Sequence, residues 1–272
     1  MERMVSPPLA DWPRPQFAAG GNDPFLFYVV YGSVDMGQPM SRSAYRSEGP
    51  PNGIELMGYG PSVHPDVVSS FRSDVLWERL TDADPELAAR IAAQDSCLII
   101  KGEIKDPPTL NYFRDVIGLL TFCLDHGGVA IYDPQMFKWW LPAEWRARAF
   151  EGGQTALHDH VTILISVEAD GTAWYHTRGM RKFGRPDISV HRVREEHRDA
   201  IIELINRFIE LLASGGSVPN GREIRMRTLP DGMTCWRRGS SDDPDFNNEH
   251  IEIVWPGSDP SQPGSPAPHA SR

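Results

Sequence analysis

Two histidines separated by a single residue, His158 and His160, form the pattern in this chain that is most typical of a metal site. They stand just before a strand that we expect to begin at Val161, and residues two apart in an extended segment point to the same side. Both imidazoles would therefore face one metal ion. The alternative is a polar strand entrance, in which the two histidines are solvated or bonded to the backbone.

Further ligands for such a site stand on the strands that follow along the chain. If the predicted hairpins stack in register, His176, Asp187 and His191 complete a mononuclear site. The chemistry would be metal-assisted hydrolysis, with Asp187 or Glu249 as the general base. A His-x-His pair has no fixed partner spacing, so this hydrolase is an alternative rather than the main interpretation.

A basic loop is the most distinctive segment of the sequence. Between residues 178 and 194 there are six basic side chains and one acidic side chain, although the whole chain has a net charge of -10. Exposed amides beside guanidinium groups would bind an anion, so an anion or nucleotide sensor is a second alternative. Otherwise the arginines pair with acidic parts of the fold. The candidate residues are Arg178, Arg181, Lys182 and Arg185.

The segment 240–250 is rich in oxygen-bearing side chains. It is not an EF-hand, because Asn248 and Val254 stand where a calcium loop needs Gly and Glu. Turn chemistry explains its Asp and Asn content without a metal. We expect this acidic loop to neutralise the basic loop.

Three of the eight tryptophans fall within seven residues: Trp139, Trp140 and Trp145. Basic residues lie between them, a pattern that also occurs on membrane surfaces and in proteins that stack bases. An aromatic wedge in a core, or a patch that faces a protein partner, is the more common arrangement. We therefore treat these tryptophans as candidates for partner contact or for the core.

Alternating periodicity indicates both strands and helices. Apolar residues at intervals of three and four predict helices that start near 85, near 108 and near 195. Short apolar or alternating runs predict the strands, at residues 25–31, 97–104, 129–132, 161–167, 173–177, 188–193, 224–228, 233–237 and 251–255.

This mixture predicts an α+β fold, in which a mainly antiparallel sheet is covered on one face by two or three long helices. In both halves of the chain a strand is followed by a long helix, so a pseudo-duplicated two-layer sandwich is an alternative. We expect a flexible lead over residues 1–22, one globular domain over 23–256 with an alternative sub-boundary near 95, and a disordered tail over 257–272.

One stretch resembles a group of uncharacterised bacterial proteins, a domain family of unknown function. The shared signature is Thr-x-Gly-hydrophobic-x-x-Phe-Gly-x-Pro-acid-hydrophobic, which the residues 177–188 match. The resemblance extends over about residues 97–215 and implies a fold, but no catalytic residues. By analogy it suits an immunity-like or adaptor-like protein of a bacterial conflict system.

Composition limits the function further. The negative net charge argues against duplex nucleic acid as a partner. No apolar run reaches the ~18 residues that are needed to span a membrane, so we expect no membrane partner. The odd number of widely spaced cysteines and the lack of a secretory pattern indicate the cytoplasm. Because no catalytic constellation is complete, we predict a non-catalytic protein-binding module without a cofactor, whose partner is another protein.

Overall fold

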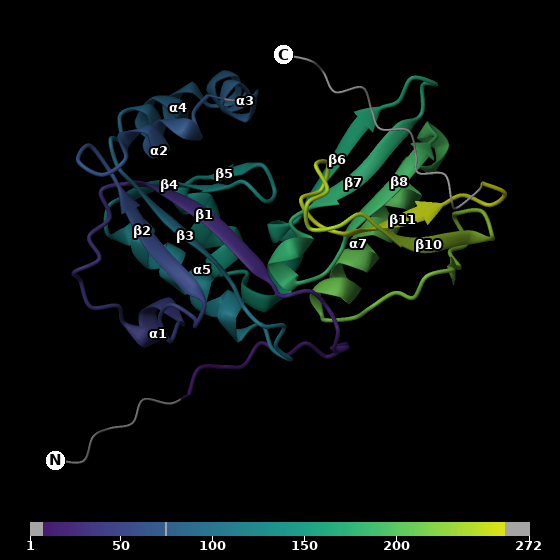
Figure 1. Cartoon of the computed structure of the whole chain (residues 1–272), viewed down its shortest axis with the longest axis horizontal. Helices are drawn as coiled ribbons and strands as arrows, with labels where there is room; N and C mark the ends of the chain where they lie inside the picture. The colour runs from purple at the N-terminus through teal and green to yellow at the C-terminus, as the bar shows by residue number, and fades with distance from the viewer. Residues whose placement is uncertain (1–7, 74, 259–272) are drawn as a thin grey trace. The chain divides into compact units, whose positions relative to one another are not determined.

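The computed structural model describes residues 8–73 and 75–258, and it divides the chain into two compact units. The first unit comprises residues 8–14 and Phe25–Ala156, and the second comprises Pro15–Pro24 and residues 157–258 (Figure 1). The sequence predicted a single domain over 23–256, with an alternative boundary near 95. Neither prediction matches, because the strand that begins at Cys97 pairs with strands on both sides inside the first unit.

The first unit contains an antiparallel sheet of five strands in the order β2-β3-β1-β4-β5. Their bounds are β1 Phe25–Gly32, β2 Ile54–Tyr59, β3 Cys97–Glu103, β4 Gly128–Asp133 and β5 Lys138–Trp140. The run of apolar residues in β1 allows this strand to lie at the centre, where both faces of the sheet are buried.

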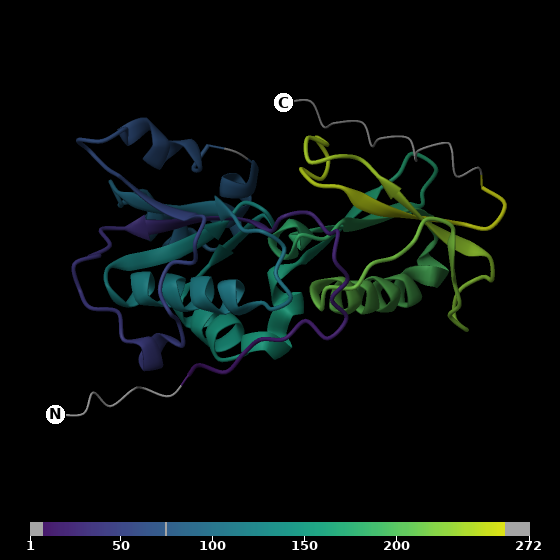
Figure 2. The same ribbon diagram turned by 60° about the horizontal axis from the view of Figure 1, so that its bottom comes forward.

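Helices cover both faces of this sheet (Figure 2). Helix α5 packs on one face, and the opposite face is covered by α2, α3 and α4. Asp84 caps α4 as predicted, since its carboxylate accepts a hydrogen bond from Leu87 N at 2.9 Å. The helices of the unit are α1 Arg42–Tyr45, α2 Pro65–Ser70, α3 Val75–Ala83, α4 Pro85–Ala92, α5 Asn111–Asp125, α6 Pro142–Glu144 and a π-helix over Trp145–Phe150.

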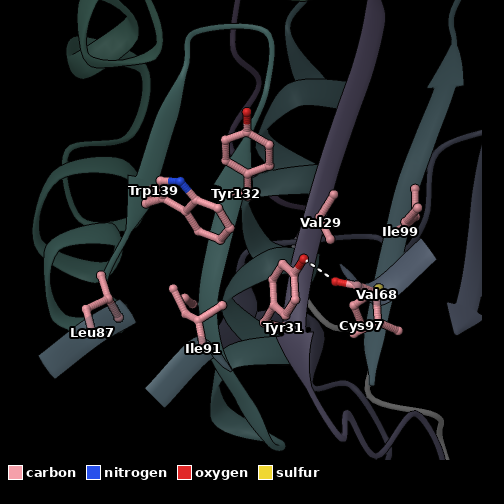
Figure 3. Close-up of a cluster of buried hydrophobic side chains, with 10 residues drawn as sticks. Val29, Tyr31, Val68, Leu87, Ile91, Cys97, Ile99, Tyr132 and Trp139 are labelled. Carbon is pink, nitrogen blue, oxygen red and sulfur yellow. Dashed lines mark hydrogen bonds between the residues drawn. The ribbon is translucent and has the colours of Figure 1, made fainter. Parts of the chain in front are cut away.

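An apolar cluster lies between the sheet and helices α2 to α4 (Figure 3). Its aromatic rings come from the strands: Trp139 stacks on Tyr132 with the ring centroids 4.3 Å apart. The Tyr31 hydroxyl donates a hydrogen bond to Val68 O at 2.7 Å and so joins the strand to α2. This face of the first sheet is therefore closed by apolar packing.

The second unit contains a six-stranded sheet in the order β6-β7-β8-β11-β10-β9, in which only β8 and β11 run parallel. Helix α7 packs on one face, and the segment before β11 crosses the other face (Figure 2). The strands are β6 Thr162–Val167, β7 Ala173–Arg178, β8 Asp187–Val193, β9 Arg222–Ile224, β10 Met233–Arg238 and β11 His250–Val254. The helices are α7 Arg198–Ala213 and 3-10 turns over Met180–Phe183 and Glu195–His197, and a further 3-10 segment, Gly153–His160, crosses the unit boundary.

The lead predicted to be flexible over 1–22 is hydrogen-bonded where the structure describes it. Arg14 forms an ion pair with Asp106 in the first unit at 2.6 Å. Ala18 N donates to Gly215 O in the second unit at 2.9 Å. Residues 1–7 of the lead, and 259–272 of the tail predicted to be disordered, lie outside the described residues.

The fold is α+β with two antiparallel-rich sheets, as predicted. The longest helices, α5 and α7, have 15 and 16 residues, and each packs on one sheet. The strand predicted at 224–228 is instead β9, which ends at Ile224, and β2 was not predicted. Within residues 8–73 and 75–258, no helix combines the length and the apolar character that crossing a membrane requires.

Candidate functional site

The three neighbouring tryptophans belong to the core of the first unit. Trp139, Trp140 and Trp145 are all buried. The ring of Trp140 meets that of Trp145 edge to face with the centroids 5.4 Å apart. Of the two predicted roles, the patch that faces a partner is wrong, because packing between sheet and helices withdraws these rings from the surface.

His158 and His160 do not point to a common ion. They lie in a 3-10 segment and not in an extended one, so residues two apart are turned about 240° from each other. His160 is fully buried, whereas the His158 side chain is 57% exposed. Among the residues that the structure describes, no group of three His, Cys, Asp or Glu side chains is arranged to hold a metal ion. The predicted metal pair is therefore wrong in its geometry.

The basic loop is not an open anion site, because three of its four candidates are buried. Lys182 is fully buried, Arg185 is 2% exposed and Arg178 is 7% exposed. The Arg185 guanidinium donates hydrogen bonds to four backbone carbonyls, those of Ala18, Gly184, Gly215 and Gly216. It thus ties the lead and the end of α7 to the loop, and it has a structural role that the sequence did not indicate.

Arg178 and Arg181 contact the segment 240–250, as expected for the acidic loop. Arg178 donates a hydrogen bond to Asp245 O, and Arg181 donates to Asn247 O at 3.0 Å. These two hydrogen bonds use backbone carbonyls, and the Arg178 guanidinium also interacts with the charges of Asp245 and Asp243. An ion pair joins Arg237 to Glu249 of the acidic loop as well.

Asp187 explains why the signature residues occur together. Its buried carboxylate accepts hydrogen bonds from Thr177 Oγ1 at 2.8 Å, Met180 N at 3.3 Å and Asn248 Nδ2 at 2.8 Å. Burial raises the pKa of Asp187 to about 6, and the three hydrogen bonds act in the opposite direction. Gly179 is needed because a Cβ there would lie 2.6 Å from His160 O, and its φ is +120°. The signature therefore encodes a local fold.

The structure does bring histidines together on the face of the second sheet that is opposite α7. The strand register places Trp174 and His176 of β7 beside Ser189 and His191 of β8. The Trp174 ring stacks on the His176 imidazole at 3.8 Å and on the His191 imidazole at 4.8 Å between centroids. We call Trp174, His176, His191 and His250 the imidazole face. Alternation of period two along β7 was the signal that could have revealed it.

Phe246 of the acidic loop covers the imidazole face. Its ring stacks on His250 with the centroids 4.1 Å apart and meets Trp174 and His176 edge to face. His176 is 6% exposed, and its Nδ1 is buried without a hydrogen-bond partner among the described residues. Burial lowers the pKa of His176 to about 3, with a smaller effect from the Arg178 charge, so this imidazole is neutral at pH 7.

Beside this face, β6 forms an unprotected edge of the sheet (Figure 1). The strand contains no charged residue, no proline and no glycine. Ile165 is 48% exposed and Val167 is 80% exposed. Natural edge strands are usually protected by charges, prolines or bulges, and β6 has none of these.

The backbone of β6 offers hydrogen-bonding groups along the same edge. Glu168 N donates to Thr172 O at 2.8 Å, which fixes the alternation of bonds between β6 and β7. By that alternation Leu164 and Ser166 bond to β7, whereas the N–H and C=O groups of Ile163, Ile165 and Val167 point outward. These three residues carry three of the four apolar side chains of the strand, and we call them the β6 edge.

Comparison of the chain with protein-family models, with curated proteins and with solved structures finds no match. The resemblance of residues 177–188 to a bacterial family of unknown function therefore stays a prediction.

Proposed function

We propose that the protein is a non-catalytic protein-binding module that adds an extended segment of another protein to the β6 edge. The observation that carries this proposal is an uncharged edge strand with two strongly exposed apolar side chains, Ile165 and Val167. Strand addition satisfies the outward N–H and C=O groups through main-chain hydrogen bonds, and side chains at alternate positions supply the specificity.

The two faces of the sheet beside β6 define the chemistry of the partner segment. Ile163, Ile165 and Val167 pair across the sheet with Thr177, Tyr175 and Ala173, so they lie on the α7 face. Leu164 and Ser166 lie on the other face, beside His176 and Trp174. A suitable segment alternates apolar residues toward the α7 face with polar residues toward the imidazole face.

An adaptor-like or immunity-like role in a bacterial cytoplasm suits this mode of binding. Three cysteines that are all buried and unpaired support a reducing compartment. The two alternatives have less support. The hydrolase requires His158 and His160 to share a side, which a 3-10 turn prevents. The sensor requires an open basic loop, and Arg185 is bonded to four carbonyls.

The test identifies the partner at the edge itself. Val167 is replaced by a photo-crosslinking amino acid, and the protein is crosslinked in its native cell. The captured protein is identified by mass spectrometry. Both proteins are then purified so that their affinity can be measured. We expect Val167→Lys and Ile165→Lys each to weaken the complex at least tenfold, equivalent to about 1.4 kcal/mol. The charged lysine would lie against apolar side chains of the partner segment, which offer no group to pair with it.

Val75→Lys is the matched control, since Val75 is 57% exposed on α3 of the other unit. It introduces the same charge and removes the same side chain, and it should leave the affinity unchanged. A partner that binds equally well to both edge variants would overturn the proposal. Capture of a second copy of this chain alone, with a dimer in light scattering, would also overturn it in favour of self-association.

A further inference from the structure

A cavity of about 350 Å³ lies in the second unit, where β8 and β11 end. Among the residues that line it are Asp170, Thr172, Arg192, Arg194, His197 and Trp255. This volume is in the range of sites that hold small organic ligands, which begins at about 300 Å³. The cavity is distinct from the β6 edge.

Arg192 stands at a β-bulge that reorients its side chain. The pairing of β7 with β8 shifts register between Ala173 and Tyr175, so that His191 and Arg192 together oppose Trp174. Arg192 has a φ of +57°, in the left-handed region that favours glycine. Bulges of this kind commonly redirect one side chain and are common beside functional sites.

Three hydrogen bonds hold this bulge in place. The Glu168 carboxylate accepts from Arg192 N at 2.6 Å and from His191 Nδ1 at 2.8 Å. The Trp255 indole N–H donates to His191 O at 2.7 Å. Glu168 is itself fixed by the Thr172 hydroxyl at 3.1 Å. The surrounding residues therefore maintain a backbone conformation that is strained for an arginine.

The walls of the cavity combine aromatic rings with guanidinium groups. Trp255 packs against His197 with ring centroids 5.3 Å apart. Because the Trp255 N–H is already bonded to His191 O, the indole offers its ring rather than its donor to a ligand. Arg192 and Arg194 are exposed at the lining. Within residues 8–73 and 75–258, the ion pair of Arg194 is a long contact of 3.8 Å with Glu196. Such long surface pairs contribute little, so the Arg194 guanidinium is available to an anion.

We propose that this cavity binds a small planar ring that carries an anionic group, the class of ligand to which nucleoside monophosphates belong. The ring packs on Trp255 and His197, and the anion accepts hydrogen bonds from Arg192 and Arg194. Asp170, whose carboxylate is oriented by Thr172 N at 3.0 Å, accepts from a hydroxyl or amine of the same ligand. The function is small-molecule binding at a site separate from the protein-binding edge.

Isothermal titration calorimetry of the full chain tests this proposal with three probes: adenosine 5′-monophosphate, adenosine and inorganic phosphate. The monophosphate combines ring and anion, so we expect it to bind at least tenfold more tightly than either part alone. Arg194→Ala should weaken its binding at least tenfold, because one of two guanidinium groups is lost. Arg225→Ala is the matched control, since the Arg225 side chain is 82% exposed and does not line the cavity.

Arg192→Gly separates a ligand-binding role from a structural one. Glycine adopts a φ of +57° without strain, so this variant should keep or raise the melting temperature while its affinity for the monophosphate falls at least tenfold. A lower melting temperature with unchanged affinity would assign Arg192 to folding and overturn the proposal. Absence of heat from all three probes, or equal binding by the monophosphate to both arginine variants and wild type, would also overturn it. Val167→Lys should bind the monophosphate normally, so failure of the β6 edge and failure of the cavity are distinguishable.

Discussion

The two sheets of this protein are built in a similar way on one face and differently on the other. Each has a long helix on one face, α5 in the first unit and α7 in the second. The remaining face of the first sheet is closed by helices and by an apolar cluster around Tyr31 and Trp139. The remaining face of the second sheet instead carries imidazoles under a loop, next to an unprotected edge.

This difference indicates which unit supports stability and which supports binding. Apolar groups that are sealed between layers stabilise a fold but offer nothing to a partner. Buried histidines and a strained arginine each reduce stability, and an uncharged edge strand favours unwanted pairing with other chains. Such features persist where they serve another purpose. The first unit carries the larger apolar core, and the second unit carries the surfaces for which we propose binding.

The largest effect is expected in the first unit. Trp140→Ala removes a fully buried ring that packs on Trp145, so it should lower the free energy of unfolding by about 3–5 kcal/mol. Urea unfolding followed by circular dichroism measures this change. Trp236→Ala, at a half-buried site of β10, is the control and should cost clearly less. A change below 1 kcal/mol for Trp140→Ala would contradict the sealed core of the first unit.

A slightly smaller effect is expected at the buried arginine of the second unit. Arg185→Met leaves the carbonyls of Ala18 and Gly216 without this donor, which should cost about 3 kcal/mol. Arg181→Met removes an exposed contact to Asn247 and should cost about 0.5 kcal/mol or less. The same urea experiment measures both variants. Equal free energies of unfolding for the two variants would contradict the structural role of Arg185 and would favour the exposed basic loop that the sequence predicted.

These two arginines also show which features of the structure can be predicted from the sequence and which cannot. Local signals, such as the Asp84 cap and the apolar stripe of α5, depend on neighbours a few residues away, and they predicted the elements correctly. Whether Arg185 faces solvent depends on Ala18, which is far away in the chain, and nothing in the local pattern reveals it. The imidazole face depends on strand register in the same way, because His250 reaches it only through the parallel pairing of β11 with β8.

The free energy of unfolding should depend on pH because of a buried histidine of the imidazole face, His176. The pKa of His176 is lowered to about 3 from 6.5, so between these values the unfolded chain binds a proton that the folded chain does not. The contribution of the neutral His176 imidazole to the free energy of unfolding is fully present above pH 6.5 and is lost as the pH falls toward 3. Between these values the free energy of unfolding falls by about 1.4 kcal/mol per pH unit.

His176→Phe keeps a ring against Trp174 and abolishes this titration. We expect the free energy of unfolding of wild type to fall more steeply than that of the variant between pH 6.5 and 4.5. Asp187, whose pKa is raised to about 6, contributes the opposite slope in both proteins and cancels in the difference. Parallel pH curves for His176→Phe and wild type would contradict the burial of this histidine.

Amide hydrogen exchange at single-residue resolution in the free protein shows whether the β6 edge is open. We expect the outward amides of Ile163, Ile165 and Val167 to exchange rapidly, while those of Leu164 and Ser166, which are bonded to β7, are protected. Protection of Ile165 equal to that of Leu164 would mean that the edge is already paired, and it would contradict the binding surface proposed for this protein.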